Sequence, residues 1–181
     1  MARRGYHLAM IETSRLRLRD WREEDIPTFA AMCADPDVMK HFPAQLSYAD
    51  ADAQARRIRA ELERNGWGLW AVEIKDGAPF VGFVGLSKPT FRDDIEIGWR
   101  LTRSAWGHGY ATEAARAALD IGFREVGLAE IVAFTVPANL PSQRVMERLG
   151  MVRDPSADFE HPNVPVGNPL RLHWLWRLSR R

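Results

Sequence analysis

The sequence predicts an α/β fold, a mixed and mostly antiparallel sheet with helices packed on it. Three observations lead to this prediction. Short runs alternate apolar and polar residues between Gly, Pro and Asp, longer segments have helical periodicity with end signals, and the two kinds interleave along the chain. No repeat or low-complexity linker divides the 181 residues. We therefore expect a single domain over residues 1–181.

The first half of the chain predicts one strand and two helices. Residues 13–21 alternate, with Leu16 and Leu18 on one face and three arginines, at positions 15, 17 and 19, on the solvent face. Helices follow over residues 23–34 and 48–65. The first ends at Asp35-Pro36 and the second at Asn65-Gly66.

The second half alternates strands and helices. A hairpin is predicted where residues 68–75 and 80–87 flank Asp76-Gly77-Ala78-Pro79, and residues 94–101 add another strand. The remaining elements are a helix over 111–126, a strand over 130–136, a helix over 139–149 and, after a proline-rich loop, a strand over 170–178. The prediction is about six to seven strands and about four helices.

Composition excludes several function classes. The net charge of +1 gives no basic field for nucleic acid or an anionic membrane. The single Cys33, expected to be buried in a helix, excludes an internal disulfide and a cysteine-based zinc cage. No run approaches the length of a membrane span, and MARRGYHLAMIETSR lacks the apolar core and cleavage pattern of a signal peptide. We expect a cytoplasmic protein that is a monomer or homodimer.

The stretch WGHGYATEAA, residues 106–115, places Gly107 and Gly109 at the mouth of a predicted helix. A helix start exposes unpaired N–H groups and a partial positive charge, and glycines before it let an anion reach the backbone. The P-loop pattern fails because no Gly-Lys-Ser/Thr follows. The dinucleotide fingerprint fits only in part, because Thr112 replaces its third glycine and no acidic residue ends the next strand.

Together with its flanks, EIGWRLTRSAWGHGYATEA resembles the pyrophosphate loop of the GNAT N-acetyltransferase superfamily. Gly109 and Ala111 fall on the two small positions of that loop, and Trp106 replaces the usual Gln or Arg, as is typical of the RimJ/RimL-like branch. The resemblance, which runs from Glu12 to Leu178, implies the GNAT fold and acetyl-CoA as cosubstrate. It implies that the cofactor-binding residues of strand and loop are Trp99, Leu101, Trp106, Gly107, His108, Gly109, Tyr110, Ala111 and Thr112.

A second match begins at Asn139-Leu140-Pro141-Ser142 and continues into VMERLGM. The resemblance implies that Asn139 bonds the pantetheine arm and that Ser142 lies by the thioester sulfur. Asn139 is also a good helix N-cap, with Pro141 tolerated in the first turn. Both interpretations can hold together.

Acetyl transfer to an amine needs a base, because only the neutral amine is nucleophilic. At pH 7 deprotonation costs on the order of 1 kcal/mol for an α-amine and about 4.6 kcal/mol for a lysine-like amine. Glu96 is the candidate base, since it shares a strand face with Gly98 and Arg100, opposite Trp99 and Leu101. The alternative is a surface glutamate paired with Arg100.

The acid that protonates the leaving thiolate is a separate question. Many members of the resembled family use a tyrosine four residues after the Ser142 position, where this chain has Met146. Ser142 is the candidate donor in its place. A backbone N–H from residues 134–137 is expected to stabilise the oxyanion, where two strands splay in this fold.

The sequence thus predicts an acetyl-CoA-dependent N-acetyltransferase working by direct transfer in a ternary complex. The acceptor stays open among a protein N-terminus, which the RimJ/RimL-like resemblance favours, a polyamine, an antibiotic and a small metabolite. A non-catalytic acyl-CoA-binding domain and an NAD-dependent oxidoreductase are the alternative functions. No metal is expected, because Asp158, Glu160 and His161 have no second histidine at ligand spacing and suit an acceptor-side loop better.

Overall fold

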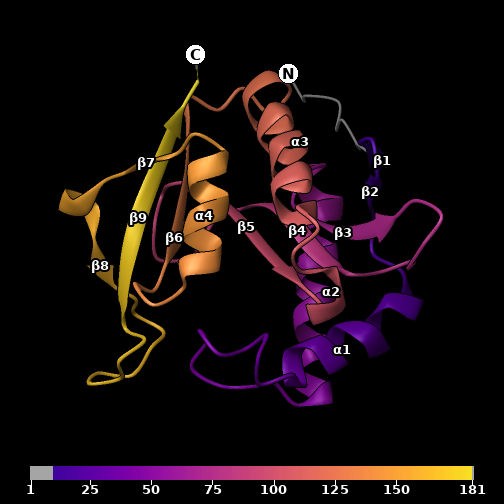
Figure 1. The fold of residues 1–181 in the computed structure, drawn as a ribbon, viewed down its shortest axis with the longest axis horizontal. Helices are drawn as coiled ribbons and strands as arrows, with labels where there is room; N and C mark the ends of the chain where they lie inside the picture. Colours follow the sequence, from indigo (N-terminus) through magenta and orange to yellow (C-terminus); the bar gives the residue numbers. More distant parts are fainter. Residues whose placement is uncertain (1–9, 181) are drawn as a thin grey trace.

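The computed structural model describes residues 10–180, built around one mixed sheet (Figure 1). The segment tested for a signal peptide lies mostly outside the described residues. The strands run in the order β1-β2-β3-β4-β5-β6-β9-β7, and β8 pairs with β9 off this path. Their bounds are Met10–Glu12 (β1), Leu16–Arg19 (β2), Leu69–Ile74 (β3), Gly82–Ser87 (β4), Glu96–Leu101 (β5), Glu130–Thr135 (β6), Val152–Arg153 (β7), Phe159–Glu160 (β8) and Leu172–Ser179 (β9).

Every pairing in the sheet is antiparallel except that of β5 with β6. The mixed, mostly antiparallel sheet is therefore confirmed. The nine strands exceed the expected number because β1, β7 and β8 are only two or three residues long. Such short pairings carry too little alternation to be recognised in a sequence.

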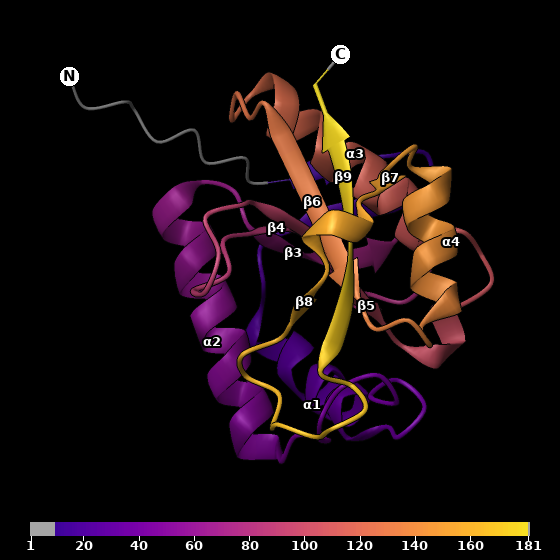
Figure 2. The same ribbon diagram turned by 90° about the vertical axis from the view of Figure 1, so that its left-hand side faces the viewer.

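Four α-helices cover the two faces of the sheet (Figure 2). Their bounds are Ile26–Ala34 (α1), Tyr48–Asn65 (α2), Tyr110–Arg124 (α3) and Leu140–Arg148 (α4). Helices α1 and α2 lie on one face, and α3 and α4 on the other. The predicted ends of α2 are confirmed, because the Ser47 side chain caps its first turn and Gly66 ends it at φ 74°. No helix within residues 10–180 is long and apolar enough to cross a membrane.

The cores of the two faces differ in composition. Under α1, the Trp21 ring packs edge-on against Phe29 at 5.1 Å between centroids and lies 5.3 Å from Phe80. Under α3, the residues turned to the sheet are the fully buried Ala114, Ala115 and Ala118. Small residues let this helix approach β4 and β5 closely, which brings its N-terminus next to the end of β5.

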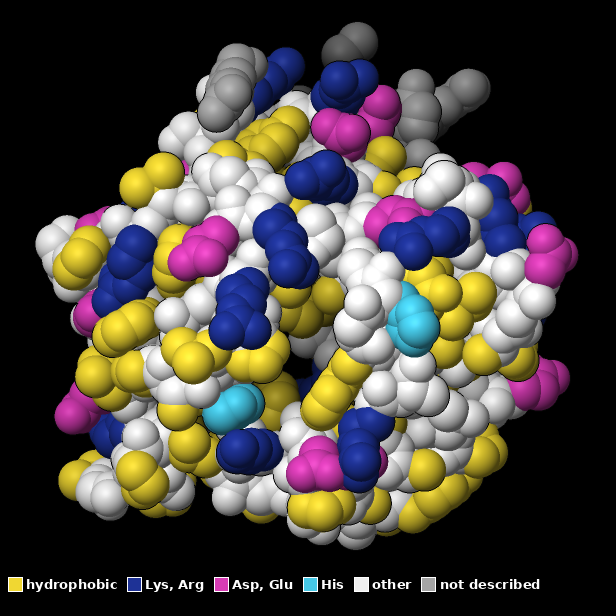
Figure 3. All heavy atoms as spheres, in the orientation of Figure 1, with side chains coloured by type: hydrophobic (Ala, Val, Ile, Leu, Met, Phe, Trp, Pro, Cys, Tyr) yellow, Lys and Arg dark blue, Asp and Glu magenta, His cyan; other side chains and the backbone are white. Residues whose placement is uncertain are grey.

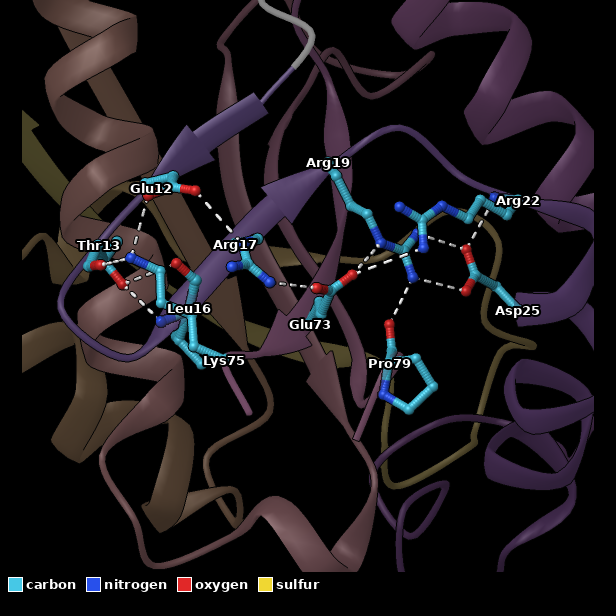
Figure 4. Close-up of polar contacts among 10 residues, drawn as sticks. All are labelled: Glu12, Thr13, Leu16, Arg17, Arg19, Arg22, Asp25, Glu73, Lys75 and Pro79. Atoms are coloured by element: carbon cyan, nitrogen blue, oxygen red, sulfur yellow. Dashed lines mark hydrogen bonds and ion pairs between the residues drawn. The ribbon is translucent and has the colours of Figure 1, made fainter. Parts of the chain in front are cut away.

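Arg19 corrects the expected solvent face of the first strand. It is 4% exposed, because the turn leading into α1 and Pro79 close over this end of β2 (Figure 4). Its guanidinium donates to both oxygens of Asp25, at 2.8 and 2.9 Å, and to Glu73 at 2.8 Å. Arg17 stays half-buried and bonds the other oxygen of Glu73. The alternation was right, but the cover over Arg19 comes from outside its strand, from the turn before α1 and from Pro79, which is 60 residues away in the sequence.

Strands β5 and β6 share one register position only, Glu96 with Val132, held by the Val132 N–H donating to the Ile95 carbonyl at 2.9 Å. Beyond this point toward their carboxyl ends the two parallel strands separate (Figure 1). The chain leaving β5 forms the Gly107–Gly109 loop, and the chain leaving β6 leads to Asn139 and α4. Both predicted site segments thus follow the splayed ends of one strand pair, where open α/β sheets bind ligands.

Candidate active site

The glycine loop at the end of β5 adopts the conformation that its two glycines permit. Gly107 and Gly109 have φ angles of 78° and 80°, in the left-handed region that disfavours other residues. A Cβ on Gly107 would meet no heavy atom within 4 Å, so open space lies over the backbone there. Gly109 is the N-cap of α3, and no side chain caps the helix. The amides of Tyr110, Ala111 and Thr112 therefore lack intrahelical acceptors.

The side chains of the loop have distinct environments. The exposed Trp106 donates its indole Nε1–H to the Leu101 carbonyl at 2.9 Å, while the Leu101 side chain lies in the core. His108 stacks on Tyr110 with the ring centroids 5.3 Å apart. The Thr112 Oγ1 atom is buried and has no protein partner. An orphaned hydroxyl at a helix start next to free amides suits an anionic ligand.

Glu113 ties the start of α3 to residues 13–15, a role that the sequence analysis did not predict. It accepts hydrogen bonds from the Thr13 hydroxyl at 2.6 Å, from the Ser14 hydroxyl, and from the backbone and side chain of Arg15. Partial burial opposes its ionisation, but these hydrogen bonds lower the pKa of Glu113 to about 2. Arg15 also donates to the His108 carbonyl at 3.0 Å, so these contacts extend to the glycine loop.

A polar cluster joins the two splayed strands on the α3–α4 side. Asn139 caps α4 by accepting from the Ser142 N–H, and its Nδ2 donates to Thr135 at 2.9 Å and to the Ser142 hydroxyl at 3.1 Å. From β5, the Trp99 indole Nε1 donates to the same Ser142 hydroxyl at 3.3 Å. Ser142 Oγ thus accepts two hydrogen bonds, and its own O–H remains available to donate.

Glu96 stands on the opposite face, at the one position where β5 and β6 pair. The residue is half-buried and has no ion-pair partner within residues 10–180. Desolvation raises the pKa of Glu96 to about 8, against a weaker opposing effect of Arg92. A carboxyl group with this pKa changes its protonation near neutral pH, which suits a general base.

The alternative in which Glu96 pairs with Arg100 is wrong. The Arg100 Nη1 group instead lies 3.3 Å from the Cys33 sulfur, and the guanidinium packs over the Phe42 ring with 4.2 Å between Cζ and the centroid. Cys33 is buried in α1, as expected. Four residues along an extended strand span about 13 Å, too far for a direct pair unless both side chains lean together.

A half-buried aromatic cluster lies on the same face of the sheet as Glu96, and the sequence analysis did not predict it. It comes from the β4–β5 loop, β6, β8 with the residue after it, and β9, and its members are Phe91, Phe134, Phe159, His161 and His173. Phe134 shares the face of Val132, the register partner of Glu96. Burial lowers the pKa of His161 to about 4 and also lowers that of His173. Both histidines of this aromatic cluster are therefore uncharged at neutral pH.

Two acidic residues between β7 and β9 form ion pairs with arginines. Asp158 pairs with Arg153 at 2.5 Å and Glu160 with Arg171 at 2.8 Å. Across residues 10–180, no group of three or more His, Cys, Asp or Glu is placed to hold a metal ion.

Figure 3 shows a hollow near the centre of the face that carries α3 and α4, with Lys and Arg side chains on its rim. The exposed arginines of the two helices include Arg116, Arg144 and Arg148. Arg116 donates to the Arg148 carbonyl at 2.8 Å and thereby connects α3 to the end of α4. The Lys and Arg side chains on the rim of the hollow suit a negatively charged ligand.

Known proteins resemble this chain in sequence and fold. The family profile of the acetyltransferase (GNAT) domain matches residues 15–152. The N-acetyltransferase YnaD of Bacillus subtilis is 32% identical over 158 residues, covering 87% of this chain and 89% of YnaD. A GNAT family acetyltransferase from Bacillus anthracis superposes with a TM-score of 0.78 at 29% identity, covering 94% of this chain and 98% of that one.

The fold also resembles that of RimL, a ribosomal L7/L12 α-N-protein acetyltransferase solved with coenzyme A. The TM-score is 0.74 at 13% identity, with 94% of this chain and 97% of RimL covered. The family match agrees with two features of the structure, the glycine loop at the start of α3 and the Asn139–Ser142 segment. The protein is a member of the GNAT family of N-acetyltransferases.

Proposed function

We propose that the protein transfers an acetyl group from acetyl-CoA directly to a primary amine, with both substrates bound, and that residues 1–181 act as one domain. The donor's pyrophosphate lies on the amides of residues 107–112. The residues fit this group: the φ angles of Gly107 and Gly109, the open space over Gly107 and the uncapped start of α3 all support an anion on the backbone. The orphaned Thr112 hydroxyl offers a further donor.

The pantetheine arm enters the gap between β5 and β6, where Asn139 binds it from the α4 side. The thioester supplies an activated carbonyl and a thiolate leaving group. Ser142 passes the proton of its free O–H to that thiolate as the C–S bond breaks and regains a proton from water. This role is supported by the two hydrogen bonds that Ser142 already accepts from Trp99 and Asn139. Met146, at the position where a tyrosine would serve as acid, is 2% exposed and turned into the core.

Glu96 takes the proton from the attacking amine, directly or through one water. One observation carries this proposal: the Glu96 carboxyl group is desolvated and has no ion-pair partner among the described residues, at the position where β5 and β6 pair before they separate. The tetrahedral oxyanion is stabilised by the Phe134 N–H. In a strand, the N–H groups of every second residue point to the same edge. The Val132 N–H points to β5, where it donates to the Ile95 carbonyl. The Phe134 N–H therefore also points toward β5, at the level where the two strands have separated.

The acceptor we favour is an α-amine, because its deprotonation is easier than that of a lysine-like amine and because RimL, whose fold this chain resembles, is a protein α-N-acetyltransferase. Acetylation of another small-molecule amine is the second candidate. The half-buried aromatic wall of Phe91, Phe134 and Phe159 supports it, since this wall suits a compact apolar acceptor.

Initial rates of CoA release test the mechanism. Acetyl-CoA is varied at several fixed concentrations of each amine, and direct transfer predicts double-reciprocal lines that intersect. Parallel lines would indicate an acetylated enzyme and contradict the proposal. A protein stabilised by acetyl-CoA and CoA that releases no CoA with any amine would instead be a non-catalytic acyl-CoA-binding domain. Stabilisation by NAD alone would favour an oxidoreductase.

A further inference from the structure

Arg100 lies on the acceptor side of the sheet and has no role in the proposed chemistry. Arg100 follows Glu96 by an even number of residues on β5, so the two side chains point to the same face of the sheet. Its contacts confirm that face, because Cys33 belongs to α1, Phe42 to the segment after α1 and Phe83 to the paired position of β4.

The charge of Arg100 has no counter-ion. Within residues 10–180 no carboxylate lies in ion-pair range, and its surroundings are a thiol and the faces of two phenyl rings. Its Nε atom is buried without a protein partner. Burial raises the pKa of the Cys33 thiol, so the thiol stays neutral at pH 7 and does not balance the guanidinium. Buried charges in proteins are ordinarily paired, because an unpaired one has lost its hydration without compensation.

The space between Glu96 and Arg100 is open. Gly98 lies between them on the same face, and a Cβ placed there would meet only the Glu96 Oε1 atom, at 4.0 Å. Along one face of β5, the candidate base Glu96 is therefore followed by open space over Gly98 and then by the unpaired guanidinium of Arg100. The span from Glu96 to Arg100 is about 13 Å between Cα atoms, roughly the length of a short extended peptide.

We propose that Arg100 binds a carboxylate of the acceptor, so that the acceptor is a short amino-carboxylate molecule with its amine at Glu96. This inference rests on the proposed function. A carboxylate fits better than a phosphate, because one negative charge neutralises the single cation while a dianion would leave excess charge in an apolar setting. A polyamine fits poorly, since its second ammonium would meet the guanidinium.

Tri-alanine and its C-terminal amide test the proposal, because they differ only in the terminal charge and have similar α-amines. We expect kcat/KM for tri-alanine to exceed that for the amide by about 10- to 100-fold, the range of a charge-assisted hydrogen bond. Arg100→Met should abolish this preference, while Arg100→Lys should keep part of it. Arg124→Met, at an exposed position near the end of α3, is the matched control. Equal rates with the two peptides, or a preference that survives Arg100→Met, would overturn the proposal.

A binding measurement separates this inference from the proposed function. The Nε–H signal of Arg100 in a ¹H–¹⁵N spectrum, assigned by its loss in Arg100→Lys, is followed in the CoA-bound protein as each peptide is added. We expect the signal to move with tri-alanine and to stay in place with the amide, whether or not acetyl transfer occurs. A signal that neither peptide moves, or that both move equally, would refute the carboxylate site. If only CoA release fails with every amine, the proposed function fails while the binding site stands.

Discussion

The Trp99 indole and the Ser142 hydroxyl come from opposite sides of the gap between β5 and α4, yet they meet in a hydrogen bond of 3.3 Å. This contact bridges the splayed strands at the place where the thioester is proposed to lie. It also fixes the direction of the Ser142 lone pairs, so that the hydroxyl proton points away from Trp99 and Asn139.

Ser142→Ala removes the proposed proton donor, together with the acceptor of the Trp99 and Asn139 hydrogen bonds. We expect kcat to fall by about 100-fold, the lower range for general acid catalysis, with little change in the KM for acetyl-CoA. Steady-state CoA release measures both constants. Ser156→Ala, which removes an exposed hydroxyl from the 3₁₀ turn at residues 155–157, is the control. Unchanged kcat in Ser142→Ala would show that the thiolate leaves without help from this residue.

Gly109→Ala tests the anion cradle. Alanine at φ 80° costs about 1–2 kcal/mol of stability. The added methyl group would also lie 3.6 Å from the Arg15 guanidinium, which holds the glycine loop through the His108 carbonyl. We expect the KM for acetyl-CoA to rise at least about tenfold, corresponding to roughly 1.4 kcal/mol.

Gly127→Ala is the matched control for this change, because Gly127 has the same φ of 80° and no atom within 4 Å of an added Cβ. It should lower stability by a similar amount without affecting the KM. If the two variants bind acetyl-CoA equally well, the loop is only a structural turn.

Glu113→Gln should destabilise the protein by up to about 3 kcal/mol at pH 7, because the folded pKa of about 2 lies well below the ordinary 4.5. A carboxylate with a depressed folded pKa stabilises the fold above its unfolded pKa. This contribution is lost as the pH falls from about 4.5 toward 2. Urea unfolding should therefore show a difference between wild type and variant that narrows over this window. A constant difference would mean that ionisation of Glu113 is not what holds the loop.

Glu96→Gln should make the protein more stable at alkaline pH. With a folded pKa of about 8, above the ordinary 4.5, the folded state holds its proton more tightly than the unfolded chain. Wild-type stability from this group therefore declines as the pH rises from 4.5 through 8, while a glutamine is unaffected. We expect the variant's advantage to grow to the order of 2–4 kcal/mol by pH 8. Parallel stability curves for the two proteins would contradict a desolvated carboxyl.

Local sequence features predicted the parts of the site that depend on local structure. The paired glycines before an alanine-rich helix and the Asn139 cap are short patterns whose geometry follows from neighbouring residues. The face alternation of β5 was also right, with Trp99 reaching α4 and Arg100 reaching α1.

Contacts between distant segments were not predictable in this way. The burial of Arg19, the partnership of Arg100 with Cys33 67 residues away, and the cluster that joins Phe91 to Phe134 and His161 all depend on how the elements pack. No periodicity within one element encodes what covers it. The contacts of Arg100 and of the aromatic cluster set the charge and shape of the proposed acceptor side, so the proposed acceptor class rests on the structure rather than on the sequence.

The most direct test of the account compares two acceptors in wild type and Glu96→Gln at pH 7. One is an alkyl α-amine that is mostly protonated, and the other is an amine of low basicity that is already neutral. If Glu96 is the base, the variant should lose about 100-fold or more in kcat with the protonated amine and far less with the neutral one. Equal losses with both amines, or no loss with either, would show that proton removal does not depend on Glu96.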